Sequence, residues 1–138
     1  MSHQAPMLYR IRHYLLVGCA ALWIGAFIAT HVPAERLPEL GAGDITLHAA
    51  GYFLLTIVFL ATLTGRGVER LRRVLTALPV MLAYGALDEI TQPLVNRYAA
   101  WSDWIANAAG AAGAVIVWEL LLAAARRRRR ASGADGAP

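Results

Sequence analysis

Acidic, basic and aromatic polar side chains recur at helical spacing within apolar stretches of this 138-residue chain. Asp44, His48 and Tyr52 follow one another at intervals of four residues, which places them on one face of a helix. Asp88 and Glu89 are adjacent in a second apolar stretch, where ionisable groups are costly and therefore indicate a function. Because carboxylates and imidazoles transfer protons, His48, Asp88 and Glu89 are the candidate catalytic residues.

Further polar residues accompany these three and are candidates for binding. Gln92 lies about one helical turn beyond the acidic pair, and Asp103 precedes Asn107 by four residues. Arg97 lies in the short connection between these two stretches, and an Arg–carboxylate pair would lower the cost of burying the acidic pair. The candidate binding residues are therefore Asp44, Tyr52, Gln92, Arg97, Asp103 and Asn107.

Four apolar segments must position these residues: 14–32, 45–64, 74–95 and 104–125. Each contains about 19 to 22 residues, and a helix of ~20 residues crosses the hydrocarbon core of a bilayer. The hydrophobic fraction of 58% exceeds the ~45–50% that is usual for soluble domains, and it excludes a disordered chain. A single Cys excludes a disulfide scaffold. The sequence predicts an all-α membrane protein with four transmembrane helices, in a single domain over residues 1–130.

The arginines predict how the four helices are oriented. Eleven of the thirteen arginines precede the first segment, lie between the second and third, or follow the fourth, while Arg36 and Arg97 lie on the other side. Because cytoplasmic loops are enriched in basic residues, we expect both termini in the cytoplasm. The net charge of +4 is then a consequence of topology. The sequence shows no module that would read the grooves of a nucleic acid, so we expect no nucleic-acid partner.

This orientation brings the polar residues to one depth. The second helix runs inward, so its polar residues occupy its outer half, and the third runs outward and carries its acidic pair in its last two turns. The fourth helix starts outside, with Asp103 and Asn107 in its first turns. Apart from Glu119, the cytoplasmic halves carry almost no polar side chain. We therefore expect a polar cluster in a cleft at the extracytoplasmic face.

Structural explanations compete with these assignments. Asp44 and Asp103 stand where helices are predicted to begin, and Asp is a favoured N-cap residue. A hydrogen bond to a neighbouring helix would account for His48, and core packing would account for Tyr52. The first segment, with its preceding arginines and its end at residues 32–34, also fits a cleaved signal peptide.

Small residues and arginines mark the fourth segment. Small faces let membrane helices approach closely, so we expect the small stripe beside Asn107 to hold this residue against a neighbouring helix. The run at residues 126–130 fits a stop-transfer anchor or a site for anionic lipid headgroups. Residues 131–138 are small and polar, which predicts a disordered tail. The small stripe consists of Ala106, Ala109, Gly110 and Gly113.

The order of these residues resembles the VanZ-like family of small bacterial membrane proteins, named for a teicoplanin-resistance protein. Its pattern is D-K-x-x-H-x-x-x-Y, then D-E-x-x-Q, an Arg, and D-x-x-x-N-x-x-G. The chain departs from it at Ile45, where the family has Lys, and in a slightly shorter interval before Arg97. The resemblance implies the bacterial cytoplasmic membrane and a link to the cell envelope or to glycopeptide susceptibility. It covers roughly residues 40–115, at Asp44, His48, Tyr52, Asp88, Glu89, Gln92, Arg97, Asp103, Asn107 and Gly110.

Two classes of function fit these residues. In an enzyme, His48 or Glu89 is the general base, Asp88 orients it or shares its proton, and Arg97 holds an anionic group. A lipid-linked envelope intermediate, such as a polyprenyl phosphate, would be the substrate. The cofactor stays unknown: no HExxH-type spacing occurs, but a divalent metal could be held by His48 with carboxylates from the set Asp44, Asp88, Glu89 and Asp103.

The alternative is a non-catalytic membrane protein that binds a lipid, peptide or antibiotic, or assists a partner. In that case the polar cluster is a structural or recognition network. Proton or ion transport would need polar groups across the full thickness of the membrane, and the apolar cytoplasmic halves disfavour it. The lipid bilayer is the partner that the sequence predicts, and the oligomeric state is left open.

Overall fold

The computed structural model describes residues 4–33 and 43–134, and these residues form helices joined by short connections. The helices are α1 (Gln4–Thr30), α2 (Asp44–Gly65), α3 (Arg70–Thr91), the short 3-10 helix η2 (Gln92–Val95) and α4 (Trp101–Ala134). Four helical stretches are long and apolar enough to cross a membrane: Tyr9–Thr30, Asp44–Gly65, Arg70–Val95 and Trp101–Ser132. The prediction of an all-α chain with four helices of membrane-spanning length is confirmed for the described residues.

The predicted segments differ from the observed helices mainly at their ends. Helices α1 and α4 extend beyond the apolar segments, since helix propagation adds one hydrogen bond per residue and Arg is a good helix former. The predicted disordered tail is therefore wrong for residues 131–134, which continue α4. Residues 135–138 and Arg36 lie outside the described residues. The third predicted segment divides into α3 and η2 because Pro93 has no N–H to continue the α-helical ladder.

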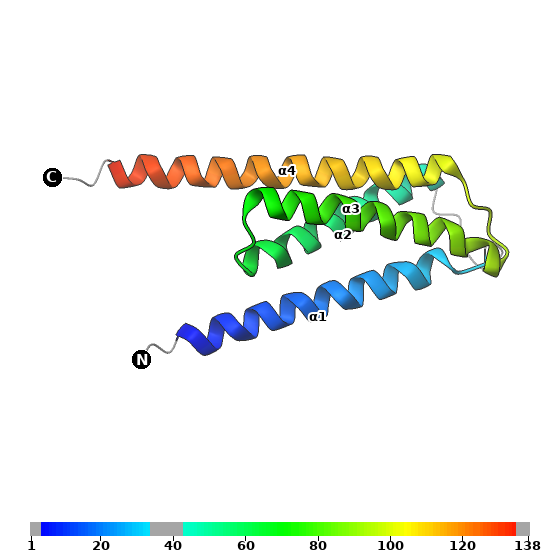
Figure 1. Cartoon of the computed structure of the whole chain (residues 1–138), viewed down its shortest axis with the longest axis horizontal. Coiled ribbons are helices and arrows are strands. Elements are labelled where there is room, and N and C mark those ends of the chain that lie inside the picture. Colours follow the sequence, from blue (N-terminus) through cyan, green and yellow to red (C-terminus); the bar gives the residue numbers. More distant parts are fainter. Residues whose placement is uncertain (1–3, 34–42, 135–138) are drawn as a thin grey trace.

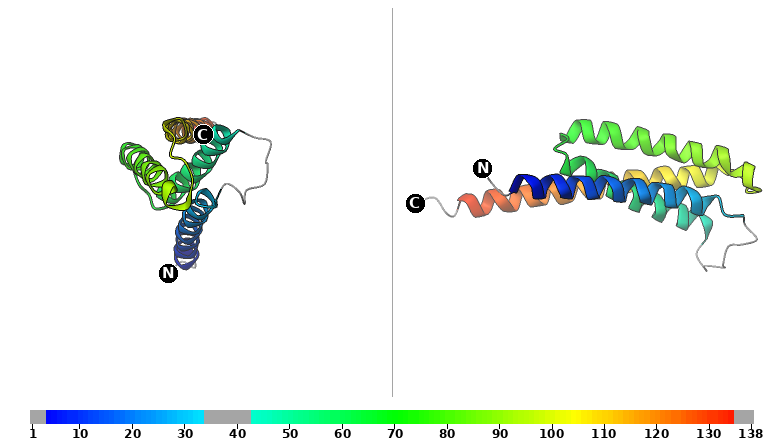
Figure 2. Two further views of the ribbon diagram at one scale, coloured as in Figure 1. Left: turned by 90° about the vertical axis from the view of Figure 1, so that its right-hand side faces the viewer. Right: turned by 90° about the horizontal axis from the view of Figure 1, so that it is seen from below.

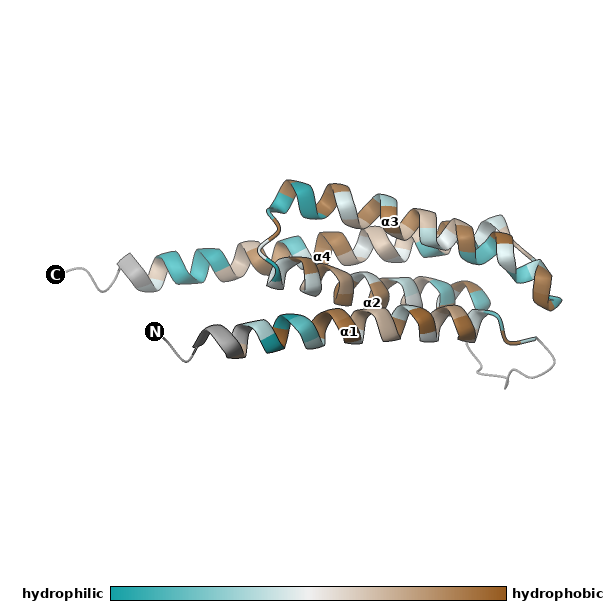
Figure 3. Cartoon of the chain, turned by 60° about the horizontal axis from the view of Figure 1, so that its bottom comes forward, coloured by the Kyte–Doolittle hydropathy of each residue, from teal (hydrophilic) through white to brown (hydrophobic). Residues whose placement is uncertain are grey.

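Helices α1, α2, α3 and α4 run in alternating directions along the bundle (Figure 1). The amino-terminal end of α1, the α2–α3 connection and the carboxyl-terminal end of α4 lie at one end of the bundle, which we call the arginine-rich end (Figures 1 and 2). At the opposite end, which we call the polar end, α1 and α3 finish and α2 and α4 begin. Figure 3 shows apolar residues over the middle of the helices and hydrophilic residues near the ends, including the projecting last turns of α4.

The core is centred on α2, which packs most extensively against α4. Gly110 of α4 permits this contact, because a Cβ at this position would lie 2.2 Å from the carbonyl oxygen of Ala49 on α2. The expectation that the small stripe allows close helix packing is therefore supported at Gly110. Helix α1 is much less buried and contributes Trp23, which packs edge-to-face on Phe59 of α2 and at a tilt on Tyr84 of α3.

Glu119, the exceptional polar residue toward the arginine-rich end, has a structural explanation. Arg73 of α3 is buried, and its Nε donates a hydrogen bond of 3.0 Å to Glu119 Oε1 on α4. Arg70 adds a contact of 3.2 Å to Oε2 of the same carboxylate, although its own side chain is 70% exposed. An uncompensated buried charge would be strongly destabilising, so Arg73 accounts for the burial of Glu119.

Candidate functional site

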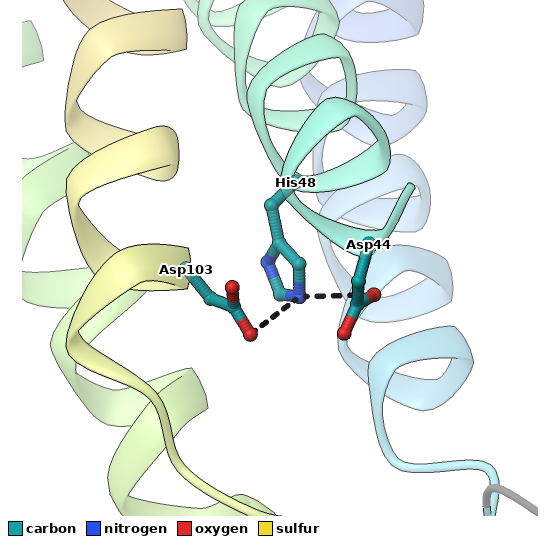
Figure 4. Close-up of side chains that lie close together, drawn as sticks. All are labelled: Asp44, His48 and Asp103. Carbon is teal, nitrogen blue, oxygen red and sulfur yellow. Dashed lines mark ion pairs between the residues drawn. The ribbon is translucent and has the colours of Figure 1, made fainter. Parts of the chain in front are cut away.

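His48 lies at the centre of the polar end, on the face of α2 that packs against α4. Its Nδ1 is 3.0 Å from Asn107 Oδ1 on α4, within hydrogen-bonding range. Its Nε2 faces two carboxylates, at 3.7 Å from Asp44 Oδ1 and 3.8 Å from Asp103 Oδ2 (Figure 4). The spacing of four residues between Asp44 and His48 brings them to one helical face as predicted, while Asp103 comes from α4.

The N-cap explanation does not hold for the two aspartates. Asp44 is the first residue of α2, whose N-cap is Gly43, and no side-chain capping hydrogen bond is present there. In α4, the N–H groups of Asp103 and Trp104 bond to the carbonyl of Ala100, which places Asp103 inside the first turn. Both carboxylates still lie near helix N-termini, where the helix dipole favours negative charge.

The adjacent carboxylates of Asp88 and Glu89 are both buried but serve different contacts. Asp88 Oδ1 accepts a hydrogen bond of 2.5 Å from the Thr30 hydroxyl at the end of α1. Glu89 Oε2 accepts a bond of 3.1 Å from the N–H of Ala100, while Oε1 lies 4.0 Å from His48 Nδ1. This divergence follows from the ~100° between neighbouring side chains on a helix, so one residue faces α1 and the other faces the start of α4.

Arg97 has a different ion-pair partner from the one expected. The sequence suggested that it would neutralise the acidic pair, but its Nη2 lies 3.7 Å from Asp44 Oδ2. No ion pair between Arg97 and Asp88 or Glu89 is found among the described residues. The reason is position: Arg97 follows η2 and the left-handed residue Asn96, so it lies near the start of α2.

Several buried polar atoms at the polar end have no hydrogen-bond partner within the described residues. Tyr52 belongs to the apolar core, as its structural explanation required, yet its hydroxyl is unpaired. Its ring and Asn107 both approach Gly85, where a Cβ would lie 3.3 Å from Tyr52 Cε1 and 3.5 Å from Asn107 Cβ. Since unpaired buried polar groups are rare in native proteins, this set indicates a place for a ligand, ion or water. The unpaired atoms at this end are Tyr52 Oη, Asp88 Oδ2, Glu89 Oε1, Gln92 Nε2 and Asn107 Nδ2.

Sequence reasoning missed the contribution of α1. Besides the Thr30 bond to Asp88, His31 Nδ1 lies 3.7 Å from Asp88 Oδ1. The same nitrogen donates to the Phe27 carbonyl at 2.7 Å, and His31 Nε2 is 2.9 Å from the Thr91 hydroxyl. The sequence did contain a signal for this contribution, because Thr30 and His31 are polar residues at the end of an apolar helix and lie at the depth of the acidic pair.

Two cavities adjoin the polar cluster, where the sequence suggested one cleft. A cavity of about 240 Å³ is lined by α1 and α2 and includes Asp44, His48, Tyr52 and Arg97. A second, of about 510 Å³, lies between α3 and α4 and has Glu89 among mainly apolar residues. Its aromatic wall is formed by Trp101 and Trp104, whose rings meet edge to face at 6.1 Å. The cluster thus separates two mainly apolar spaces.

Two overlapping sets of ligand atoms are close enough to share a metal ion. One consists of Asp44, His48 and Asp103, and the other of His48, Asp88 and Glu89, with the atoms of each set within 4.8 Å of one another. The arrangement therefore offers proton transfer, anion binding through Arg97, and metal coordination. Comparisons of the chain with protein-family models, with curated proteins and with solved structures found no match.

Proposed function

We propose that the chain is a VanZ-like enzyme of the bacterial cytoplasmic membrane that performs acid–base chemistry on a lipid-linked intermediate of the cell envelope. The observation that carries the proposal is the environment of His48. Its ring is buried, Asn107 holds one nitrogen, and the side chain lines a mainly apolar cavity that also contains Arg97. A positioned acid–base group beside an apolar space and a cation suits an amphiphilic, anionic substrate.

The residues divide into distinct roles in this reaction. Arg97 binds the anionic head of the substrate, since a guanidinium recognises phosphate and carboxylate oxygens. The apolar residues of the cavity between α1 and α2 contact its hydrocarbon chain. The proton acceptor is His48 or Glu89, because both are buried and each has an atom without a hydrogen bond facing the cluster. Asp88 orients the cluster through its contact with α1.

The test compares isosteric variants that remove acid–base capacity. Wild-type protein, Glu89→Gln and Asp88→Asn are reconstituted in nanodiscs with a bacterial lipid extract, and lipid species are followed by mass spectrometry. We expect the wild type to consume a lipid-linked species, and Glu89→Gln to do so about 10²–10⁴-fold more slowly. Glu69→Gln is the matched control, because Glu69 is exposed at the arginine-rich end.

Retained turnover in a folded Glu89→Gln variant would exclude Glu89 as the acid–base group. If Glu89→Gln, Asp88→Asn and His48→Gln all fold with unchanged thermal midpoints and consume substrate as the wild type does, the acid–base proposal is wrong. Teicoplanin susceptibility of cells producing each variant gives a second readout, and we expect Glu89→Gln to behave as cells without the protein.

A binding or accessory role is the second candidate function. It is favoured by the bonds from Thr30 to Asp88 and from Ala100 to Glu89, which tie helix ends together as a structural network would. In that case Asp88→Asn and Glu89→Gln would lower the thermal midpoint, and a lipid would copurify without being consumed. The same nanodisc experiment distinguishes the two functions.

The proposed orientation rests on the arginines, eleven of which lie toward the arginine-rich end of the bundle or in its flanking chain. Both described termini lie at this same end, so one reporter tests the orientation of the whole bundle. A reporter enzyme fused after Pro138 is expected to show cytoplasmic activity. Activity outside the cytoplasm would place the polar end on the cytoplasmic side and remove the access of the site to envelope intermediates.

A further inference from the structure

We propose that Asp44, His48 and Asp103 bind a divalent transition metal ion of the zinc class at the polar end. This inference rests on the proposed function, because it assigns a further role to the same cluster. Figure 4 shows the His48 ring directed between the two carboxylates, one from α2 and one from α4. Three observations support a metal in this position: the hydrogen-bond partner of His48 Nδ1, the spacing of the ligand atoms and the access to the site.

The tautomer of His48 follows from its contact with Asn107. The Asn107 oxygen only accepts hydrogen bonds, so His48 Nδ1, 3.0 Å away, carries the proton. In the neutral ring the lone pair is then on Nε2, which is the nitrogen that faces Asp44 and Asp103. A metal-ligating His typically donates its other N–H to an acceptor that fixes ring and tautomer, and Asn107 occupies that place.

The spacing of the atoms is unsuited to hydrogen bonds and suited to coordination. Distances of 3.7 and 3.8 Å from His48 Nε2 to the two carboxylate oxygens exceed hydrogen-bonding range. Two ligand atoms bonded at about 2.0–2.1 Å to one tetrahedral Zn²⁺ lie roughly 3.3–3.4 Å apart. A shift of a few tenths of an ångström would bring His48 Nε2 to this spacing from each carboxylate, and the ligand atoms of the two carboxylates lie within 4.8 Å of each other. His48 is 6% and Asp103 7% exposed, so both side chains are largely buried.

The alternative set of His48, Asp88 and Glu89 is less suited to a metal. It would use His48 Nδ1, the nitrogen nearest Glu89, which is already bonded to Asn107. One oxygen of Asp88 is bonded to Thr30, and one oxygen of Glu89 to the N–H of Ala100. With an ion at Nε2 of His48, Glu89 is left as the proton acceptor of the proposed reaction.

The set of Asp44, His48 and Asp103 also gives a metal ion access to the site. The Asp44 side chain is 57% exposed, which gives an ion a path from the surface. Asp44 and His48 line the cavity between α1 and α2, so a coordination position open to substrate would face that cavity. Three protein ligands with an open position are typical of catalytic zinc sites. An imidazole among the ligands favours Zn²⁺ over Mg²⁺ and Ca²⁺, which prefer oxygen ligands alone.

The experiment measures Zn²⁺ binding in the absence of any substrate. The full chain is purified in detergent through a tag without histidine and titrated with Zn²⁺ by calorimetry, with bound metal counted by mass spectrometry. We expect one equivalent per chain in the wild type, and an affinity reduced at least about 10-fold in His48→Gln and Asp103→Asn. Mg²⁺ at the same concentrations is expected to bind much more weakly.

Two variants serve as matched controls. His31→Gln changes another histidine that lies 3.7 Å from a carboxylate at the same end, but whose two nitrogens are within 2.7 and 2.9 Å of other oxygen atoms. Asp88→Asn changes the alternative ligand set only. Both are expected to bind Zn²⁺ as the wild type does, and loss of binding in Asp88→Asn together with full binding in Asp103→Asn would overturn the assignment.

The thermal midpoint of each variant is measured without metal, which separates loss of Zn²⁺ binding from loss of folding. The visible absorption of bound Co²⁺ adds a readout in the wild type, because its intensity distinguishes four-coordinate from six-coordinate sites. We expect the stronger, four-coordinate spectrum. Absence of Zn²⁺ and Co²⁺ binding in folded wild-type protein would refute the metal site. Glu89-dependent turnover without bound metal would then leave the proposed enzyme function intact, whereas metal binding without turnover would refute that function alone.

Discussion

Substitution of Gly110 by Ala is expected to separate α2 from α4 and to break the contact between His48 and Asn107. The added Cβ would lie 2.2 Å from the Ala49 carbonyl oxygen and 3.1 Å from the N atom of Phe53. Carbon–oxygen contacts between packed helices are about 3.3–3.6 Å, so the helices must move apart by roughly 1 Å at this point. Both contacted atoms belong to the backbone of α2, which leaves no flexible side chain to give way.

The size of the effect follows from three contributions. Overpacking of this kind costs about 1–3 kcal/mol. A shift of roughly 1 Å would also lengthen the His48–Asn107 hydrogen bond from 3.0 Å beyond bonding range, a loss of about 1 kcal/mol. Replacing Gly by Ala in a helix returns up to about 1 kcal/mol through helix propensity. The free energy of unfolding of Gly110→Ala is therefore expected to fall by about 1–3 kcal/mol.

The assay is unfolding in mixed detergent micelles with increasing dodecyl sulfate, followed by circular dichroism. Gly18→Ala is the matched control, because nothing lies within 4 Å of a Cβ at this position of α1. Gly85→Ala should give an intermediate loss, since its Cβ would lie 3.3 Å from a Tyr52 ring atom that has some freedom to move. If Gly110→Ala unfolds at the same dodecyl sulfate fraction as Gly18→Ala, the close approach of α2 and α4 is not a feature of the folded protein.

Two further predictions concern buried charges. Arg73→Met should lower the free energy of unfolding by about 3–5 kcal/mol, because Glu119 is left buried without its main partner, and the double variant Arg73→Met/Glu119→Leu should recover much of this loss. Arg70→Met, at a side chain 70% exposed, should cost less than about 1 kcal/mol, and an equal loss in the two single variants would contradict the assignment. Thr30→Val should cost about 1–3 kcal/mol in the same unfolding assay because Asp88 loses a donor, whereas Thr30→Ser keeps the hydroxyl and should match the wild type.

The four helices were predictable because their signal is local. Each needs only a run of apolar residues long enough to cross a bilayer, and the helix backbone satisfies its own hydrogen bonds there. The same local rule predicted that Asp44 and His48 share a helical face, and their atoms do lie 3.7 Å apart. The end of α4 was less predictable, since arginine carries no strong signal to stop a helix.

The contacts between helices were decided by tertiary structure alone. Thr30 and Asp88 are 58 positions apart, and His48 and Asn107 are 59 positions apart. Whether such pairs meet depends on the rotation of each helix about its axis and on how closely the axes approach. Gly110 sets that approach for α2 and α4 by having no side chain; the small stripe predicted a close approach of helices but not that α2 would be the helix in contact.

The sequence by itself therefore determined the four apolar helices and the end of the bundle at which their polar residues gather. Only the tertiary structure decided that Arg97 pairs with Asp44, that α1 supplies Thr30 and His31, and that the free nitrogen of His48 faces two carboxylates. The physical reason is that helix formation and membrane insertion depend on short stretches of sequence. Side-chain partners, in contrast, depend on packing between helices that are distant along the chain.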